Sequence, residues 1–192
     1  MIMLNKDNQF GRSMIEMLGV LAIIGVLSVG GISGYSKAMA KYKLTKAQDQ
    51  ITILLMNIRT AYATSPTYGE LSATNAIQWN LAPSDMYSSS SASKLYNTFG
   101  GEVKISDCSS SNNNACGDIE SGSTYFGIQM EGLSNDACRS LASADWGTDG
   151  LMGIKINDAS SHTTTDLPIS LGTASNECNK TDNTNVIAWV YY

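Results

Sequence analysis

Apolar residues are concentrated near the start of the chain, where residues 14–35 contain a single charged side chain, Glu16. A helix needs about 20 apolar residues to span a bilayer, so this stretch is just long enough to be a membrane segment. From residue 44 the pattern becomes amphipathic: polar residues such as Gln50 fall on other faces, and an apolar stripe is wide enough to pack on a sheet. The stripe consists of Leu44, Ala47, Ile51, Leu54, Leu55, Ile58 and Tyr62. Because Pro66 disfavours helix in the residue before it, the two patterns together predict one helix over about residues 12–63.

Later segments carry the alternating, or β-branched and aromatic, composition that is typical of strands. These segments are residues 102–106, 124–130, 151–157 and 186–191. Residues 133–144 place small and aliphatic side chains on one face, with Ser134 or Asn135 as an N-cap, and predict a short helix. Residues 66–100 are predicted to form an irregular loop with one short helix. This order predicts an α+β domain in which the long helix packs on a roughly four-stranded antiparallel sheet.

All the cysteines lie in the second half of the chain, at Cys108, Cys116, Cys138 and Cys178. No Cys-x-x-Cys occurs, and the spacings do not supply the Cys/His pairs of a zinc site. An even number of cysteines behind an export-like N-terminal segment indicates disulfides formed in an oxidising compartment. Four cysteines allow three pairings. The short spacer favours Cys108–Cys116 and leaves Cys138–Cys178 to close a larger loop.

The charged residues argue against nucleic-acid binding, and four lysines follow the apolar segment. The formal net charge of −5 gives no basic field, which argues against nucleic-acid binding. Between Lys37 and Lys46 the chain carries four lysines and no acid. Such a stretch fits a segment that leaves the membrane towards anionic headgroups or acidic partners.

Other candidate sites have weaker support in the sequence. Residues 145–150 place acidic side chains around glycines, but an EF-hand would need glutamate where Ile156 stands, so we expect a solvated turn. His162 has no cysteine or carboxylate at ligand spacing and is expected in a surface loop. We find no nucleophile elbow, phosphate loop or paired-carboxylate signature in the sequence, and therefore predict no enzyme, cofactor or metal.

The apolar segment has three interpretations. As a secretory signal peptide it would be cleaved after Ala38-Met39-Ala40, but the apolar run is long for that role. As a plain membrane anchor it leaves Glu16 unexplained, since a carboxylate at bilayer depth costs several kcal/mol. In the third interpretation the glutamate is necessary.

Gly11 followed by Arg12-Ser13-Met14-Ile15-Glu16 and an apolar run resembles the processing signature of type IV prepilins. The resemblance implies that a prepilin peptidase cuts after Gly11, that Arg12 becomes the N-methylated first mature residue, and that Glu16 is the fifth. It also implies the pilin fold, with a leader over residues 1–11, a hydrophobic half-helix over 12–43 and a head over 44–192. The implied function is that of a structural subunit, inserted in the inner membrane as a precursor and polymerised by the pilus assembly machinery into an extracellular helical homopolymer. Adhesion, aggregation, motility or DNA transfer would be properties of that filament.

The resemblance gives Glu16 a partner. Cleavage creates a cationic α-amine on Arg12, and the carboxylate of one subunit can pair with the amine of its neighbour, which fixes their register. Arg12 departs from the family, which favours an apolar first residue, and its guanidinium lies at i, i+4 from Glu16. The family's helix-breaking proline is also missing. Gly30, Gly31 and Gly34 stand near its level, and they either loosen the helix or allow close helix packing.

The predicted helix inside the cysteine-bounded region resembles larger type IVb pilins more than type IVa ones. Two alternatives stay open at this point. One is a pseudopilin of a type II secretion system, and the other is a membrane-anchored periplasmic binding domain that does not polymerise.

Overall fold

The computed structural model describes residues 13–88, 93–109, 115–147 and 149–192. The predicted leader and the Gly11–Arg12 cleavage site therefore lie outside the described residues. The chain divides into two compact units, of which the first ends at Tyr42 and the second, called the head below, is Lys43–Tyr192. We describe each unit by itself.

Helix α1 runs without interruption over Ser13–Ala61, as the two apolar patterns predicted. Its part in the first unit exposes nearly all its side chains, including Ile15 at 80% and Val26 at 75% exposure. The helix ends five residues before Pro66, where the Ala63 amide donates to Thr60 O instead of to the carbonyl four residues back. The residues near the proline thus end the helix as expected.

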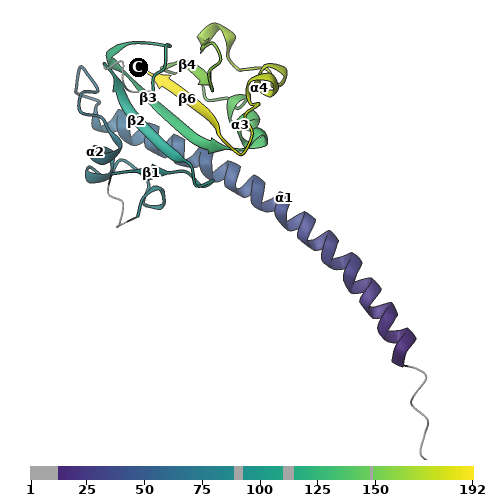
Figure 1. Ribbon diagram of the computed structural model, residues 1–192. Helices are drawn as coiled ribbons and strands as arrows, with labels where there is room; N and C mark the ends of the chain where they lie inside the picture. Colours follow the sequence, from purple (N-terminus) through teal and green to yellow (C-terminus); the bar gives the residue numbers. More distant parts are fainter. Residues whose placement is uncertain (1–12, 89–92, 110–114, 148) are drawn as a thin grey trace, which may run out of the picture. The chain divides into compact units, whose positions relative to one another are not determined.

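The head contains an antiparallel sheet with strand order β1-β2-β3-β6-β4-β5. Figure 1 shows β6, in yellow, between β3 and β4. The long strands are β2 (Glu102–Cys108), β3 (Gly122–Leu133), β4 (Leu151–Ile156) and β6 (Asn185–Tyr191). The two edge strands are β1 (Leu95–Tyr96) and β5 (His162–Thr163).

The strand predictions are confirmed for the four long strands and incomplete at the edges of the sheet. β3 is longer than predicted because it continues through an irregularity between Met130 and Leu133. The edge strands have two residues each, too few to show a period of two in sequence. The sheet is therefore six-stranded, with a four-stranded centre that the sequence predicts.

The second part of α1 packs on the sheet through the predicted stripe. Ala47, Ile51, Leu54 and Ile58 are fully buried in one cluster with Ile128, Ile187 and Trp189, among other sheet residues. Burying an aliphatic side chain of this size stabilises the fold by about 1.5–3 kcal/mol relative to leaving it exposed. This stripe is therefore what attaches α1 to the rest of the head.

Polar side chains of α1 also contact the head, and here one expectation is wrong. Gln50, expected on a polar face away from the stripe, is buried, and its Nε2 donates to Asp85 Oδ2 at 3.0 Å. Asp85 also pairs with Lys46 at 2.8 Å. Burial acts to raise the pKa of Asp85, but the hydrogen bonds from Lys46 and Gln50 outweigh it and hold this pKa below its ordinary value.

Short helices connect the strands. α2 (Ala73–Gln78) and the 3-10 turn η1 (Ser84–Met86) lie in the segment that was predicted to be a loop with one short helix. α3 (Asn135–Ala142) is capped by Ser134, as predicted. A further 3-10 turn, η2 (Thr164–Asp166), precedes α4 (Leu171–Glu177). The sequence did not predict α4, whose seven residues bury only Ala174 and so show no apolar stripe.

Candidate assembly segment and head

The exposed part of α1 is the candidate assembly segment. Residues 14–36 carry apolar side chains on every face, and the helix that contains them is long and apolar enough to cross a membrane. Glu16 lies in the first turn of this helix with its side chain exposed. The amides of a helix N-terminus favour a negative charge there. The same segment therefore presents a large apolar surface and one carboxylate at its start.

Three glycines, called the glycine segment below, lie within the regular part of α1; they are Gly30, Gly31 and Gly34. A Cβ atom placed at any of them would meet no atom within 4 Å apart from the adjoining residues and backbone of the helix itself. The subunit itself therefore gives no steric reason for glycine at these positions. The predicted roles, loosening the helix or allowing close approach of another helix, both concern a state other than this subunit.

Both disulfides of the head join the cysteines in the pairing that the spacing favoured. Cys108–Cys116 closes a short loop, and Cys138–Cys178 links α3 to the end of α4. The first holds Ala115 and Cys116 against β3, where a Cβ at Gly127 would clash with the Ala115 carbonyl and the Cys116 amide. That glycine is required because the backbone of the loop lies directly on the strand.

Two buried asparagines anchor the region that Cys138–Cys178 bounds. Asn185 is fully buried at the start of β6, and its Nδ2 donates to Leu133 O at 3.0 Å and to Asn135 Oδ1 at 2.7 Å. Its Oδ1 accepts from Asn157 Nδ2 at 3.0 Å and from the Lys180 amide at 3.1 Å. Asn185 thus joins the ends of three strands to the loop that follows the disulfide.

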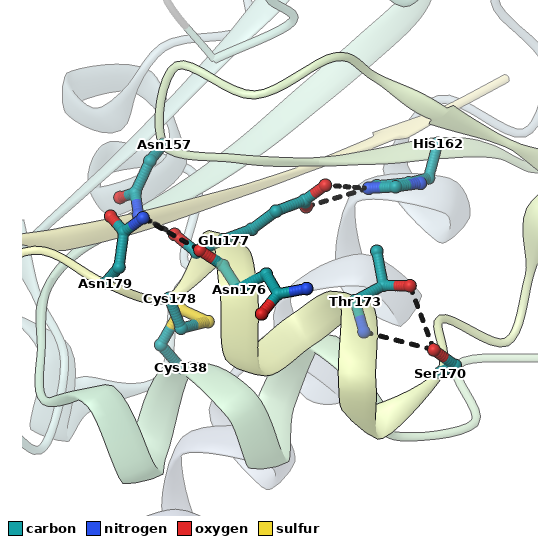
Figure 2. Close-up of polar contacts among 9 residues, drawn as sticks. All are labelled: Cys138, Asn157, His162, Ser170, Thr173, Asn176, Glu177, Cys178 and Asn179. Atoms are coloured by element: carbon teal, nitrogen blue, oxygen red, sulfur yellow. Dashed lines mark hydrogen bonds and ion pairs between the residues drawn. A yellow bond between two sulfur atoms is a disulfide. The ribbon is translucent and has the colours of Figure 1, made fainter.

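Asn157 extends this network to α4. Its Nδ2 also donates to Glu177 O at 2.7 Å, as Figure 2 shows, and its Oδ1 accepts from the Val186 amide at 2.8 Å. Asn157 has a φ of 51°, a left-handed conformation that asparagine tolerates better than most residues. Neither asparagine was predicted from the sequence, where an asparagine at each strand end was the only available signal.

His162 corrects the expectation of a surface loop residue without a partner. It lies in the edge strand β5, and its Nε2 lies 2.8 Å and 3.0 Å from the two carboxylate oxygens of Glu177. Figure 2 shows the two side chains pointing towards each other, His162 from β5 and Glu177 from α4. Both side chains are mostly buried, at 16% and 19% exposure. The pair therefore fastens α4 to the edge of the sheet.

The turn around residues 145–150 is organised by the protein's own groups. Asp145 Oδ1 accepts from the Gly147 amide at 2.9 Å, and Asp149 O accepts from Arg59 Nη2 at 2.8 Å. The Arg59 guanidinium also lies over the Tyr191 ring, 5.4 Å from its centroid. Burial raises the pKa of the Tyr191 hydroxyl, and Arg59 only partly opposes this. Among the described residues, no group of three His, Cys, Asp or Glu side chains could hold a metal ion.

Several ion pairs lie on the surface of the head. Lys155 Nζ lies 2.6 Å from Asp118 Oδ1, which also accepts from Ser161 Oγ at 2.7 Å. These two hydrogen bonds lower the pKa of Asp118 to about 2. Lys180 pairs with Asp158 at 2.7 Å in the same way. The acids of these pairs are therefore ionised at neutral pH.

Comparisons with known proteins place the chain among pilus subunits. A family model described as "PilS N terminal" matches residues 41–191. Two relatives, each named major structural subunit of bundle-forming pilus, come from Escherichia coli O111:H- and from Escherichia coli O127:H6 (strain E2348/69 / EPEC). They are 26% and 27% identical to this chain over 197 and 199 residues, and each alignment covers 97% of this chain and 96% of the relative.

The fold is similar to that of a solved pilin structure. This is the crystal structure of a type IV b pilin from Salmonella typhi, with a TM-score of 0.53 at 23% identity, and the match covers 78% of this chain and 97% of that one. A long N-terminal helix, an antiparallel sheet and two disulfides occur together in the chain described here. The predicted α+β pilin fold is thus confirmed.

Proposed function

This chain belongs to the PilS N-terminal family, and we propose that it is a structural subunit of a type IV pilus of the IVb kind. Its role is to polymerise with copies of itself and not to catalyse a reaction. The relatives named above are structural subunits of a pilus, which supports the same role here. The proposed path runs from a precursor in the inner membrane to an extracellular helical filament.

One observation carries this proposal: a single helix has two different environments along its length. The stripe from Ala47 to Ile58 is buried in the head, whereas residues 14–36 expose apolar side chains on every face. Exposed apolar surface of that extent needs either lipid or other copies of the same helix to cover it. A membrane covers it before assembly, and neighbouring helices cover it in the filament.

Processing creates the group that pairs with Glu16 between subunits. In the proposed sequence of events, a prepilin peptidase removes residues 1–11 by cutting after Gly11, and the new α-amine of Arg12 is methylated. The cationic amine of one subunit then pairs with the Glu16 carboxylate of the next. Removing one member of a buried ion pair strands the other at a cost of about 3–5 kcal/mol, so the pair specifies register in an apolar core. Residues 12–43 would form that core and residues 44–192 the surface of the filament.

The experiment compares filaments from cells that express the wild-type chain, Glu16→Ala, or the control Asp158→Ala. Asp158 is an exposed carboxylate of the head, outside the proposed core, and it already pairs with Lys180 of its own subunit. We expect filaments from the wild type and the control and few or none from Glu16→Ala, at equal subunit levels. Normal filaments from Glu16→Ala would refute the ion pair.

N-terminal sequencing of the mature subunit tests the processing step independently. We expect the mature chain to begin at Arg12. An intact Met1, or a start near Lys41, would refute the proposed pilin processing. A chain that begins at Arg12 but forms no filaments would point to a pseudopilin, and an uncleaved chain that stays in the membrane would point to an anchored domain.

A further inference from the structure

We propose that two lysines of α1, Lys37 and Lys41 (the lysine pair), bind the acidic surface of the head of a second copy in the filament. The inference rests on the proposed function, because it requires that copies assemble side by side. It assigns the lysine pair an electrostatic contact that adds to the apolar packing of the helices.

The lysine pair differs from the lysines of the head in what surrounds it. Five head lysines each lie within 4 Å of a carboxylate: Lys46, Lys94, Lys104, Lys155 and Lys180. Within the described part of the chain, neither Lys37 nor Lys41 has such a partner, and both are exposed. The head thus satisfies nearly all its own lysines, whereas the lysine pair keeps its charge available.

The helix itself does not compensate the lysine pair. Residues that lie three or four positions apart on a helix are neighbours, and Lys37 and Lys41 are such a pair with like charge. The other residues at these spacings are uncharged; they are Ser33, Gly34, Ala38, Ala40, Leu44 and Thr45. Like charges at this spacing weaken an isolated helix, so a partner outside the helix is the physical reason to place them together.

The head carries the opposite charge in excess. Residues 43–192 contain 15 acidic and 8 basic side chains. Most of the basic side chains are engaged within the head, so the surplus is carboxylate. Six exposed carboxylates have no lysine or arginine nitrogen within 4 Å among the described residues; they are Asp49, Glu70, Asp145, Asp149, Asp166 and Asp182. A second copy therefore offers exposed carboxylates whose charge is opposite to that of the lysine pair.

Lipid headgroups fit the lysine pair less well than a second copy does. The disulfides place the head in an oxidising compartment, so residues 37–41 leave the membrane on the side away from the cytoplasm. Lysines that flank a membrane helix normally favour the cytoplasmic side, and the anionic surface potential that attracts them belongs to the cytoplasmic leaflet. Membrane orientation therefore gives no reason for these lysines.

The test replaces the lysine pair without changing its size much. Lys37→Gln with Lys41→Gln removes two positive charges. The matched control, Lys94→Gln with Lys180→Gln, also removes two positive charges, but from lysines that already pair with carboxylates of their own head. Filaments are sheared from cells and compared with total subunit, while non-reducing gels verify the disulfides. We expect the lysine-pair variant to yield about 2- to 30-fold fewer filaments, as expected for losing two exposed ion pairs per subunit. Lys37→Arg with Lys41→Arg should restore the yield, and the control should match the wild type.

Carbodiimide cross-linking identifies the partner directly, because this reagent joins an amine to a carboxylate in contact with it. We expect Lys37 or Lys41 joined to carboxylates of the head in filaments, and not in detergent-solubilised single subunits. Wild-type filament yield from the glutamine variant, or an equal loss in the control, would overturn the inference while leaving the proposed function intact. A glutamine variant that is lost from the membrane fraction would overturn it in favour of headgroup binding. If the wild-type chain forms no filaments, the proposed function fails first.

Discussion

Removing the Cys138–Cys178 disulfide should destabilise the head more than removing Cys108–Cys116. The two bonds close loops with sequence separations of 40 and 8 residues. In the chain-entropy model, a disulfide stabilises the fold by restricting the unfolded chain, and the effect grows with the logarithm of loop length. The separations correspond to about 4 kcal/mol for Cys138–Cys178 and about 2.5 kcal/mol for Cys108–Cys116 at 25 °C. The predicted difference, about 1.4 kcal/mol, is tenfold in the unfolding equilibrium constant.

Each disulfide serves as the control for the other, because both are buried. All four cysteines are buried, at 4% exposure or less, so replacement by alanine leaves no exposed thiol and buries no new hydroxyl at either site. After removal of Cys138–Cys178, α4 keeps its link to Asn157 and its pair with His162. The loss should therefore appear in global stability and not as release of α4.

The assay is guanidinium unfolding of the full chain in detergent, followed by the fluorescence of the buried Trp189. Free energies of unfolding are compared for the wild type and for the two double alanine variants, with the dependence on denaturant tested for a single two-state transition. An equal loss in both variants, or a larger loss without Cys108–Cys116, would refute the loop-entropy reasoning.

Three further predictions concern the head and the glycine segment. Asn185→Ala removes a buried side chain that makes five hydrogen bonds, and it should lower the free energy of unfolding by about 2–4 kcal/mol. The exposed control Asn176→Ala should change it by less than about 0.5 kcal/mol, and equal effects would contradict the anchoring role. Replacing all three glycines of the glycine segment by alanine should stabilise the helix by up to about 1 kcal/mol per residue, which would be measured as higher helicity in detergent. The same variant should give fewer filaments. An unchanged filament yield would show that assembly requires neither a looser helix nor close approach of another helix at these positions. The Asp118 pKa of about 2 means that its pair with Lys155 stabilises the fold above the ordinary carboxyl pKa and that this contribution is lost as the pH falls towards 2. Melting temperatures of wild type and Asp118→Asn should thus differ at pH 5 and converge near pH 2, and a constant difference would refute the assignment.

The long helix and the central strands could be predicted because their patterns are local. The stripe from Ala47 to Ile58 repeats at helical spacing, and each central strand carries its own β-branched or alternating residues. The cysteine pairing was also accessible, since the spacer after Cys108 is short enough to favour Cys116. In each case the information lies within one segment of the chain.

The polar contacts of the head could not be predicted, because each joins segments far apart in sequence. The buried Gln50 donates to Asp85, which lies 35 residues later. His162 finds Glu177 only after β5 pairs with β4 and α4 folds back beside it. The partner of a polar residue depends on the tertiary structure, whereas the burial of an apolar stripe can be predicted from the local sequence.

The proposed assembly segment contains one feature that can be predicted from the sequence and one that cannot. The apolar run and Glu16 can be read from sequence, and the structure adds that α1 is continuous into the head. The partner of Glu16 in the proposal belongs to another copy and exists only after cleavage, so a single subunit cannot contain it.

A map of sheared filaments by cryo-electron microscopy, at a resolution that separates side chains, tests the central claim most directly. The proposal predicts that residues 14–36 of neighbouring copies pack in parallel in the filament core, with each Glu16 carboxylate within about 4 Å of a neighbour's N-terminal amine. A filament whose core is built from another part of the chain, with α1 exposed on its outside, would contradict it.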